Sequence, residues 1–373
     1  MSEEGRSGAK RSRAGAETEV PVLPRRRGRP AALALLVVVV GVAAAGVVAG
    51  YLLSAPSATP TEVEFEVLPG WAGRQVAAAL HDDGLIRSEL AFTSYLRFKD
   101  LDHSIGEGLY DLTPAMSVAR IATELAAGGR PRIVEIVVPE GWRAANIVTR
   151  LAANGVADER TLTELVRRPG PELAPSYLPQ GRGLEGYLYP ATYEVPVHSS
   201  AEQALELMVK RFGTELESIG GPDLSSLLSA RDLSVHSWVT LASMVQAEAA
   251  GVEEMGIIAG VFLNRLELGM PLQSDPTAAY GLGKSLPELS ATAGDLRIET
   301  QWNTYTLPGL PFGPIGSPGA DALKAVLEPD RYAADGALYL FFLHGSDGGE
   351  PVFRPNTNLP AHNRDVQAYL RND

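Results

Sequence analysis

The most informative segment for the fold of the C-terminal half is SVHSWVTLASMVQAEAAG, residues 234–251. Its apolar residues recur three and four positions apart, which predicts an amphipathic helix packed into a core. Ser234 is a typical N-cap, and we expect Gly251 to cap the other end. Glu248 follows Met244 by four residues, so its carboxyl is predicted to lie on the apolar face of this helix rather than on the solvated one.

The predicted position of Glu248 suggests acid–base chemistry. A carboxyl group held among apolar side chains resists ionisation, so its pKa rises. A raised pKa lets a glutamic acid donate a proton near neutral pH, as a general acid must. A lone glutamate on a helix is more often a solvent-exposed residue, so the neighbouring sequence has to supply further support.

Two turn-rich segments, 269–281 and 301–319, follow a second apolar helix predicted over 257–266. Both segments are rich in proline and in side chains that hydrogen-bond sugar hydroxyls, which suits a preformed cleft, although ordinary turn formation explains the same composition. Asp275 could equally cap the turn before Pro276. The candidates for orienting a substrate are Gln273, Asp275, Thr277, Asn303 and Tyr305.

An aromatic loop over residues 184–193 reads LEGYLYPATY. Its three tyrosines could form an apolar wall with polar edges, which suits the faces of sugars, so Glu185 and Tyr187 are further candidates for substrate contact. Glu185 is also a weaker alternative acid. The competing interpretation, an aromatic hairpin in the core, is slightly favoured for this loop.

An uncharged apolar run covers residues 31–53. At about 1.5 Å per residue it would extend roughly 34 Å, enough to span a hydrocarbon core of about 30 Å. A cleaved signal peptide has a shorter apolar stretch, although 55–58 resembles a small-residue cleavage site. Four arginines lie within 25–29, and none follows the run until Arg74. The positive-inside rule therefore predicts a single-pass protein of the cell membrane with a cytoplasmic N-terminus.

Composition excludes several classes of function. The net charge is −13, yet residues 1–30 are basic, so the part beyond the membrane is strongly acidic and unsuited to nucleic acid. The chain has no cysteine, which excludes disulfides and thiolate metal sites. Its six histidines form no recognisable zinc motif, and no glycine-rich phosphate loop follows a predicted strand. We expect no metal and no cofactor.

A pattern of strand, Gly-Trp turn and helix occurs twice, 71 residues apart, with the strands predicted over 63–68 and 133–138. Two copies are too few for a solenoid and indicate two small α/β units. Such units resemble the LysM-like modules that bind amino-sugar polymers, whereas a common connection that binds nothing would look the same. The matched pairs are Trp71 and Trp142, Val76 and Ile147, Leu80 and Leu151, and Gly84 and Gly155.

Several motifs, in one order, resemble the YceG-like family of endolytic murein transglycosylases. The resemblance runs from about residue 63 to the C-terminus, and the predicted anchor fits it. The family usually has two glutamates in the helix, two positions apart; Gln246 stands at the first position here, so Glu248 alone matches the catalytic one. The motifs are Met244–Ala249, Val261–Leu266, Leu272–Thr277, Tyr280–Gly283, Asn303–Tyr305, Gly309–Pro311, Gly313–Ile315 and His362–Arg364.

The resemblance implies endolytic cleavage of nascent peptidoglycan strands at the outer face of the membrane, beside the cell-wall synthesis machinery. The bond between MurNAc and GlcNAc would be cut to leave a 1,6-anhydro-MurNAc end, terminating the strand, with Glu248 acting first as acid and then as base. Two rivals remain. One is a muramidase that uses Glu248 with Asp275, and the other is a membrane-anchored scaffold that binds peptidoglycan without cutting it.

The predicted fold class is α+β, with an N-terminal transmembrane helix, LysM-like α/β units and a mixed α/β catalytic domain. The predicted divisions are a disordered cytoplasmic tail (1–30), the transmembrane helix (31–53), a linker (54–62), the first LysM-like unit (63–130), the second such unit with connecting helices (131–230) and the catalytic transglycosylase domain (231–373).

Overall fold

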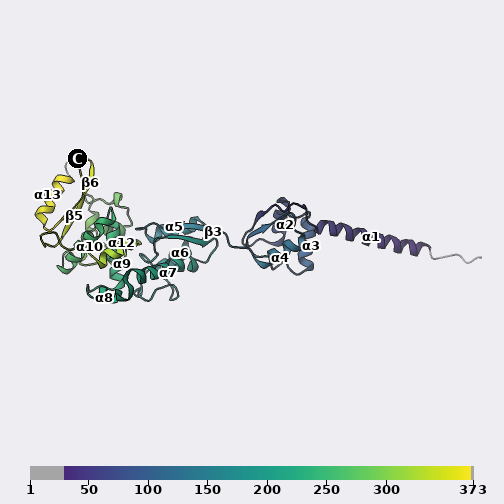
Figure 1. Ribbon diagram of the computed structural model, residues 1–373, viewed down its shortest axis with the longest axis horizontal. Helices are drawn as coiled ribbons and strands as arrows, with labels where there is room; N and C mark the ends of the chain where they lie inside the picture. Colours follow the sequence, from purple (N-terminus) through teal and green to yellow (C-terminus); the bar gives the residue numbers. More distant parts are fainter. Residues whose placement is uncertain (1–28, 371–373) are drawn as a thin grey trace, which may run out of the picture. The chain divides into compact units, whose positions relative to one another are not determined.

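The computed structural model describes residues 29–370, so the predicted cytoplasmic tail up to residue 28 lies outside the described residues. The chain divides into two compact units, one ending at Arg130 and the other beginning at Pro131 (Figure 1). Helices and two-stranded antiparallel sheets occur in the same units, which confirms the mixed α+β class.

The first unit joins a long apolar helix to a small α/β core. Strands β1 and β2 pair antiparallel, with Phe65 opposite Tyr110, and the helices pack their apolar faces against this ribbon. The elements are α1 (Arg29–Leu53), β1 (Val63–Val67), α2 (Gly73–Asp82), α3 (Glu89–Phe98), β2 (Gly108–Leu112) and α4 (Val118–Ala127).

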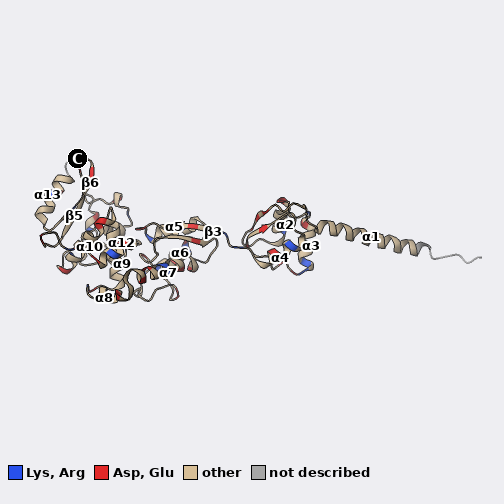
Figure 2. Cartoon of the chain, viewed as in Figure 1, with Lys and Arg blue, Asp and Glu red and all other residues tan. Residues whose placement is uncertain are grey.

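Helix α1 is long and apolar enough over Ala32–Leu53 to cross a membrane. The most apolar part of this stretch is not buried inside the protein. Figure 2 shows this helix without charged residues along that stretch. The start of the predicted linker is fixed to the first unit, because Arg87 donates to the carbonyls of Ala55 and Pro56 at 2.8 and 3.0 Å.

The second unit contains two further antiparallel pairs, β3 with β4 and β5 with β6. Its elements are β3 (Ile133–Val137), α5 (Ala144–Ala153), α6 (Glu159–Arg167), β4 (Thr192–Pro196), α7 (Ala201–Gly220), η1 (Gly221–Asp223), α8 (Leu224–Ser229), α9 (Val235–Glu248), α10 (Val252–Glu267), α11 (Asp275–Gly281), η2 (Leu286–Glu288), η3 (Asp295–Arg297), α12 (Ala320–Leu327), β5 (Phe341–Asp347), β6 (Glu350–Asn356) and α13 (Leu359–Tyr369).

The repeated pattern is present in the structure and is longer than the sequence indicated. Both copies run strand, helix, helix, strand, and the two strands of each copy pair with each other. Val76 and Ile147 are both fully buried, and Gly84 and Gly155 both adopt a left-handed φ near 70° that favours glycine. The likeness to LysM modules stays a prediction.

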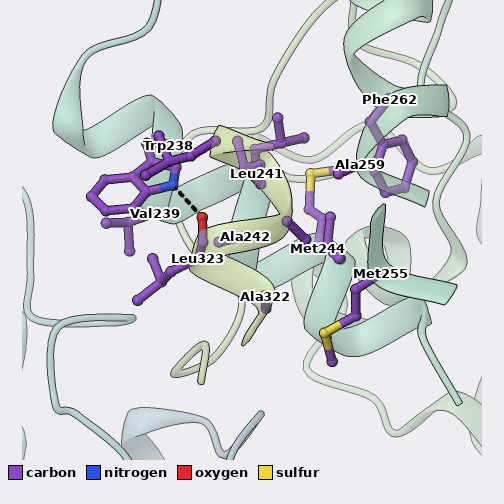
Figure 3. Close-up of a cluster of buried hydrophobic side chains, with 14 of the residues drawn as sticks. Trp238, Val239, Leu241, Ala242, Met244, Met255, Ala259, Phe262, Ala322 and Leu323 are labelled. Atoms are coloured by element: carbon purple, nitrogen blue, oxygen red, sulfur yellow. Dashed lines mark hydrogen bonds between the residues drawn. The ribbon is translucent and has the colours of Figure 1, made fainter. Parts of the chain in front are cut away.

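Helix α9 lies in the larger of the second unit's two hydrophobic clusters. Every residue from Trp238 to Val245 is buried, and α10 and α12 pack against this helix. Figure 3 shows the Trp238 indole donating to the Leu323 carbonyl, at 2.9 Å. Phe212 of α7 belongs to the same cluster, so the parts before and after residue 230 share one core. The functional division at residue 230 stays a prediction.

The ends of α9 and α10 correct one prediction. Ser234 is the N-cap of α9 as expected, accepting from the Ser237 backbone N–H at 3.1 Å, but Gly251 is not its C-cap. The helix ends at Glu248 because Ala249 is extended, and Gly251 instead precedes α10, which begins five residues earlier than predicted. Glu248 therefore lies at the corner between two packed helices.

Candidate active site

The Glu248 carboxyl is held at the C-terminal end of α9 by a buried hydroxyl. Ser274, which is 1% exposed and precedes α11, donates from its Oγ to Glu248 Oε1 at 2.6 Å. Glu248 itself keeps partial exposure to solvent. A carboxyl that is fixed by a hydrogen bond, in a residue that is partly exposed, can meet an incoming bond without losing its orientation.

The surroundings of Glu248 raise its pKa to about 7. Burial is the largest cause, because it disfavours the charged form, and the neighbouring Asp275 carboxylate adds to the rise. The Ser274 hydroxyl and the Arg265 guanidinium act in the opposite direction. The group therefore exists in both protonation states near neutral pH, which a residue acting as acid and then as base requires.

A cluster of buried hydroxyls holds Ser274 in place. Thr304 Oγ1 accepts from the Ser274 backbone N–H at 3.0 Å and is hydrogen-bonded to Thr277 Oγ1 at 2.8 Å. Thr277 in turn donates to the Ser274 carbonyl at 2.6 Å. Thr277 is fully buried and supports Ser274, and its contact with substrate stays a prediction.

Asn303 has the same supporting position. It is 1% exposed, its amide donates to the carbonyls of Leu296 and Ile298 at 3.0 and 2.8 Å, and its oxygen accepts from the Tyr305 backbone N–H at 3.0 Å. The hydrogen bonds of this side chain are directed at its own loop, and its contact with substrate stays a prediction. Asn303 shapes the loop that presents Tyr305.

Gln273 and Asp275 flank Ser274 and are both exposed. Gln273 has a φ of 54°, a left-handed conformation that residues other than glycine rarely adopt, and its backbone N–H donates to the Thr304 carbonyl at 3.2 Å. Tyr305 donates from its hydroxyl to Asp275 Oδ1 at 2.6 Å, and burial followed by this carboxylate raises the tyrosine's pKa. Because Ser274 occupies the N-cap of α11, Asp275 is free of that role.

Arg265 also belongs to this site, although the sequence pattern did not assign it a function. It is 8% exposed, and it donates to the carbonyls of Leu340 and Leu272 at 2.7 and 2.8 Å, fixing the start of the loop that carries Gln273. Its charge favours the ionised form of Glu248. The available signal was that Arg265 is the one charged residue in the predicted apolar helix 257–266, and a charged residue is rarely buried without a partner.

Two residues of the aromatic loop, Tyr187 and Glu185, have different surroundings. Tyr187 is fully buried, packs edge-on against Phe212 with ring centroids 5.3 Å apart, and is hydrogen-bonded to His236 at 2.7 Å. Tyr187 therefore lies in the core, as the competing interpretation expected, although the loop is a turn leading into β4 rather than a hairpin. Its contact with substrate stays a prediction. Glu185 accepts from the Ala144 backbone N–H at 2.9 Å and from the Tyr280 hydroxyl at 2.8 Å, and burial raises its pKa.

Within the residues from 29 to 370, no group of three or more His, Asp or Glu side chains is placed to hold a metal ion. The candidate site therefore consists of Glu248 with Ser274 and Arg265 behind it, and Gln273, Asp275 and Tyr305 beside it. These residues come from α9, α10, the loop between α10 and α11, the first residue of α11 and the loop that contains Tyr305.

The sequence model of the YceG-like family matches residues 65–368, most of the chain. The chain belongs to the YceG-like family. This confirms the resemblance inferred from the motifs around Glu248, and the matched range contains every residue of the candidate site.

Similar proteins carry a common name. The endolytic murein transglycosylase of Bacillus subtilis is 30% identical over 323 residues, covering 83% of this chain and 85% of that protein. The endolytic murein transglycosylase of Streptococcus pneumoniae is 28% identical, and the alignment covers 80% of this chain but 56% of that longer protein. A crystal structure of a YceG-like protein from Listeria monocytogenes has a TM-score of 0.51 at 28% identity, covering 82% of this chain and 99% of that one.

Proposed function

We propose that this YceG-like protein is an endolytic lytic transglycosylase, which cleaves the bond between MurNAc and GlcNAc in peptidoglycan strands and leaves a 1,6-anhydro-MurNAc end. The observation that carries the proposal is the Glu248 carboxyl, fixed by Ser274 and with a pKa of about 7. The names of the relatives from Bacillus and Streptococcus support the same reaction.

In the first step protonated Glu248 acts as general acid. It donates its proton to the oxygen that bridges the two sugars, the bond from that oxygen to the anomeric carbon breaks with its electron pair, and GlcNAc leaves with a free hydroxyl. Positive charge develops on the MurNAc ring. The exposed Asp275 carboxylate, held by the Tyr305 hydroxyl, is suited to stabilise that charge, and Gln273 is suited to hydrogen-bond a sugar hydroxyl.

In the second step the Glu248 carboxylate acts as base. It accepts the proton of the MurNAc 6-hydroxyl while that oxygen bonds to the anomeric carbon and closes the anhydro ring. No water is consumed, and the nucleophile has a high effective concentration because it belongs to the same sugar. Arg265 and Ser274 stabilise the carboxylate between the two steps.

The muramidase alternative uses the same residues differently. Hydrolysis needs a second carboxylate to activate water, and Asp275 would have to supply it. The Tyr305 hydroxyl bound to Asp275 favours a fixed electrostatic role over that one. The mass of the products separates the two reactions, since hydrolysis adds one water to each cut. A scaffold that only binds strands would give no products.

We also propose that α1 anchors the enzyme in the cell membrane as a single span with the N-terminus in the cytoplasm. The length and apolar character of Ala32–Leu53 support the span, and the arginines before it support the orientation. This placement would bring the site to nascent strands near the synthesis machinery, where cutting would terminate strand growth. Protease added to intact spheroplasts is expected to digest the part after α1; protection of that part would refute the orientation.

Ser274→Ala is expected to shift the pH dependence of cleavage. Loss of the hydroxyl raises the pKa of Glu248, because this hydrogen bond favours the ionised form. The alkaline limb of the kcat/KM profile, where the acid loses its proton, should therefore move to higher pH. Ser226→Ala in α8, an exposed serine, serves as the control. An alkaline limb that stays in place in Ser274→Ala would contradict the assignment of that limb to Glu248.

A further inference from the structure

Two large apolar side chains of α3 point away from the core of the first unit. Leu90 is 77% exposed and Phe98 is 83% exposed. They are eight residues apart, slightly more than two helical turns, so they lie on one face of the helix with Ser94 between them. Isolated exposed apolar residues are common on soluble proteins, whereas two on one helical face indicate a surface that meets something apolar.

Helix α3 lies beside the last turns of α1 (Figure 1). An open groove of about 460 Å³ separates the two helices. Leu90 and Phe98 of α3 line one side, and Ala45, Val48 and Leu53 of α1 line the other. The groove is therefore continuous with the surface of the predicted membrane span.

The angle between α1 and α3 is held by specific contacts. The Arg87 guanidinium lies 4.4 Å from the centre of the Tyr51 ring and donates to its hydroxyl at 3.1 Å. Arg87 also donates to two carbonyls directly after α1, and Leu53 packs against the core of the first unit. These contacts prevent α3 from moving freely relative to the end of α1.

Helix geometry gives the position of the groove relative to the hydrocarbon core of the bilayer. The apolar stretch Ala32–Leu53 has 22 residues, about 33 Å, which exceeds a hydrocarbon core of roughly 30 Å by little. Ala45 precedes Leu53 by about 12 Å along the axis, so Ala45 and Val48 lie within the hydrocarbon if α1 spans the bilayer. The α3 side chains that share a groove with Ala45 and Val48 must reach into the same leaflet.

We propose that the exposed face of α3 is immersed in the outer leaflet and that a lipid acyl chain fills the groove between α1 and α3. The inference rests on the proposed anchoring by α1. Arg97 and Lys99, which flank Phe98 and are both exposed, can extend to the phosphate layer while Phe98 stays among acyl chains. The first unit is then seated on the membrane at a fixed height rather than tethered above it.

The absence of cysteine from the chain allows a direct test. Leu90→Cys and Phe98→Cys are each labelled with a nitroxide in the full chain, which is reconstituted into vesicles of phosphatidylethanolamine and phosphatidylglycerol. Accessibility is measured to oxygen, which concentrates in lipid, and to a nickel chelate, which stays in water. Val48→Cys on α1 is the lipid reference, and Asp82→Cys, whose side chain is 83% exposed outside the groove, is the water reference.

We expect the ratio of oxygen to nickel accessibility at positions 90 and 98 to match Val48→Cys and to exceed Asp82→Cys several-fold. A ratio equal to that of Asp82→Cys would overturn the inference, and so would low accessibility to both reagents, which would indicate a protein partner on this face. A water-like ratio at Val48→Cys would overturn the anchor itself. Cleavage by Phe98→Cys is measured separately, so failure of the proposed reaction is distinguishable from failure of this inference.

Discussion

Glu248→Gln is expected to reduce cleavage of glycan strands by about 10³-fold or more, because an amide cannot donate the proton that the leaving oxygen needs. The glutamine oxygen can still accept the Ser274 hydroxyl, so the local geometry is preserved. The rate of appearance of anhydro ends from purified peptidoglycan measures the effect. Glu202→Gln, an exposed glutamate in the first turn of α7, is the matched control and should cleave at the normal rate.

The same substitution is expected to stabilise the protein at alkaline pH. The folded pKa of Glu248, about 7, lies above the ordinary value of 4.5, so the folded state binds more protons than the unfolded state between these values. The stability that protonation contributes is therefore complete below pH 4.5 and lost as the pH rises through 7. Glu248→Gln lacks this loss, and its free energy of unfolding at pH 8 should exceed that of the wild type by up to about 3 kcal/mol.

Denaturant unfolding at pH 4.5 and pH 8 measures this difference. A loss of activity together with a gain in stability at pH 8 is the signature of a residue maintained for chemistry rather than for folding. Equal stability of the two proteins at both pH values would contradict the raised pKa. Cleavage at the wild-type rate by Glu248→Gln would favour the scaffold or another acid, with Glu185 the first to examine.

Trp238→Ala is expected to have the largest effect on stability, lowering the free energy of unfolding of the second unit by about 3–5 kcal/mol. Trp238 is fully buried and belongs to the cluster in Figure 3, so its removal leaves a cavity lined by α9 and α12. It also leaves the Leu323 carbonyl without its hydrogen bond. Chemical denaturation followed by near-ultraviolet circular dichroism measures the change.

Two further variants separate the causes of this effect. Trp238→Phe keeps most of the apolar volume and loses the indole donor, so it should be less destabilising than Trp238→Ala. Trp71→Ala removes a partly exposed tryptophan from the first unit and should leave the unfolding of the second unit unchanged. A cost below about 1 kcal/mol for Trp238→Ala would mean that α9 does not pack into this core.

The features that could be predicted from the sequence are those that depend on local periodicity. The spacing of apolar residues predicted α9 and the burial of the side chains around Trp238. The paired glycines of the repeat predicted two matching turns, and Gly84 and Gly155 both have the left-handed φ that explains their presence. The apolar length of α1 could be predicted equally well, because recognising a candidate membrane span requires only composition and length.

The features that could not be predicted depend on contacts between distant residues. The hydroxyl that holds Glu248 comes from Ser274, 26 residues later, and the hydroxyl that accepts from the Ser274 backbone comes from Thr304. Polar residues such as Thr277 and Asn303 look alike in sequence whether they bind a ligand or a backbone carbonyl. Only the fold shows that both are buried.

The end of α9 was mispredicted for a similar reason. Glycine is common at helix C-termini, so Gly251 was the natural choice. The helix instead stops at Glu248 because α10 begins directly afterwards and packs back against α9. Tertiary packing therefore decides where the carboxyl is placed.

Proton donation by Glu248 to a glycosidic bond, without consumption of water, can be tested by mass spectrometry of the products formed in water enriched in oxygen-18. Wild-type protein should release strands with anhydro ends that contain no oxygen-18, and Glu248→Gln should release none. Reducing ends that carry oxygen-18, or undiminished release by Glu248→Gln, would contradict the account.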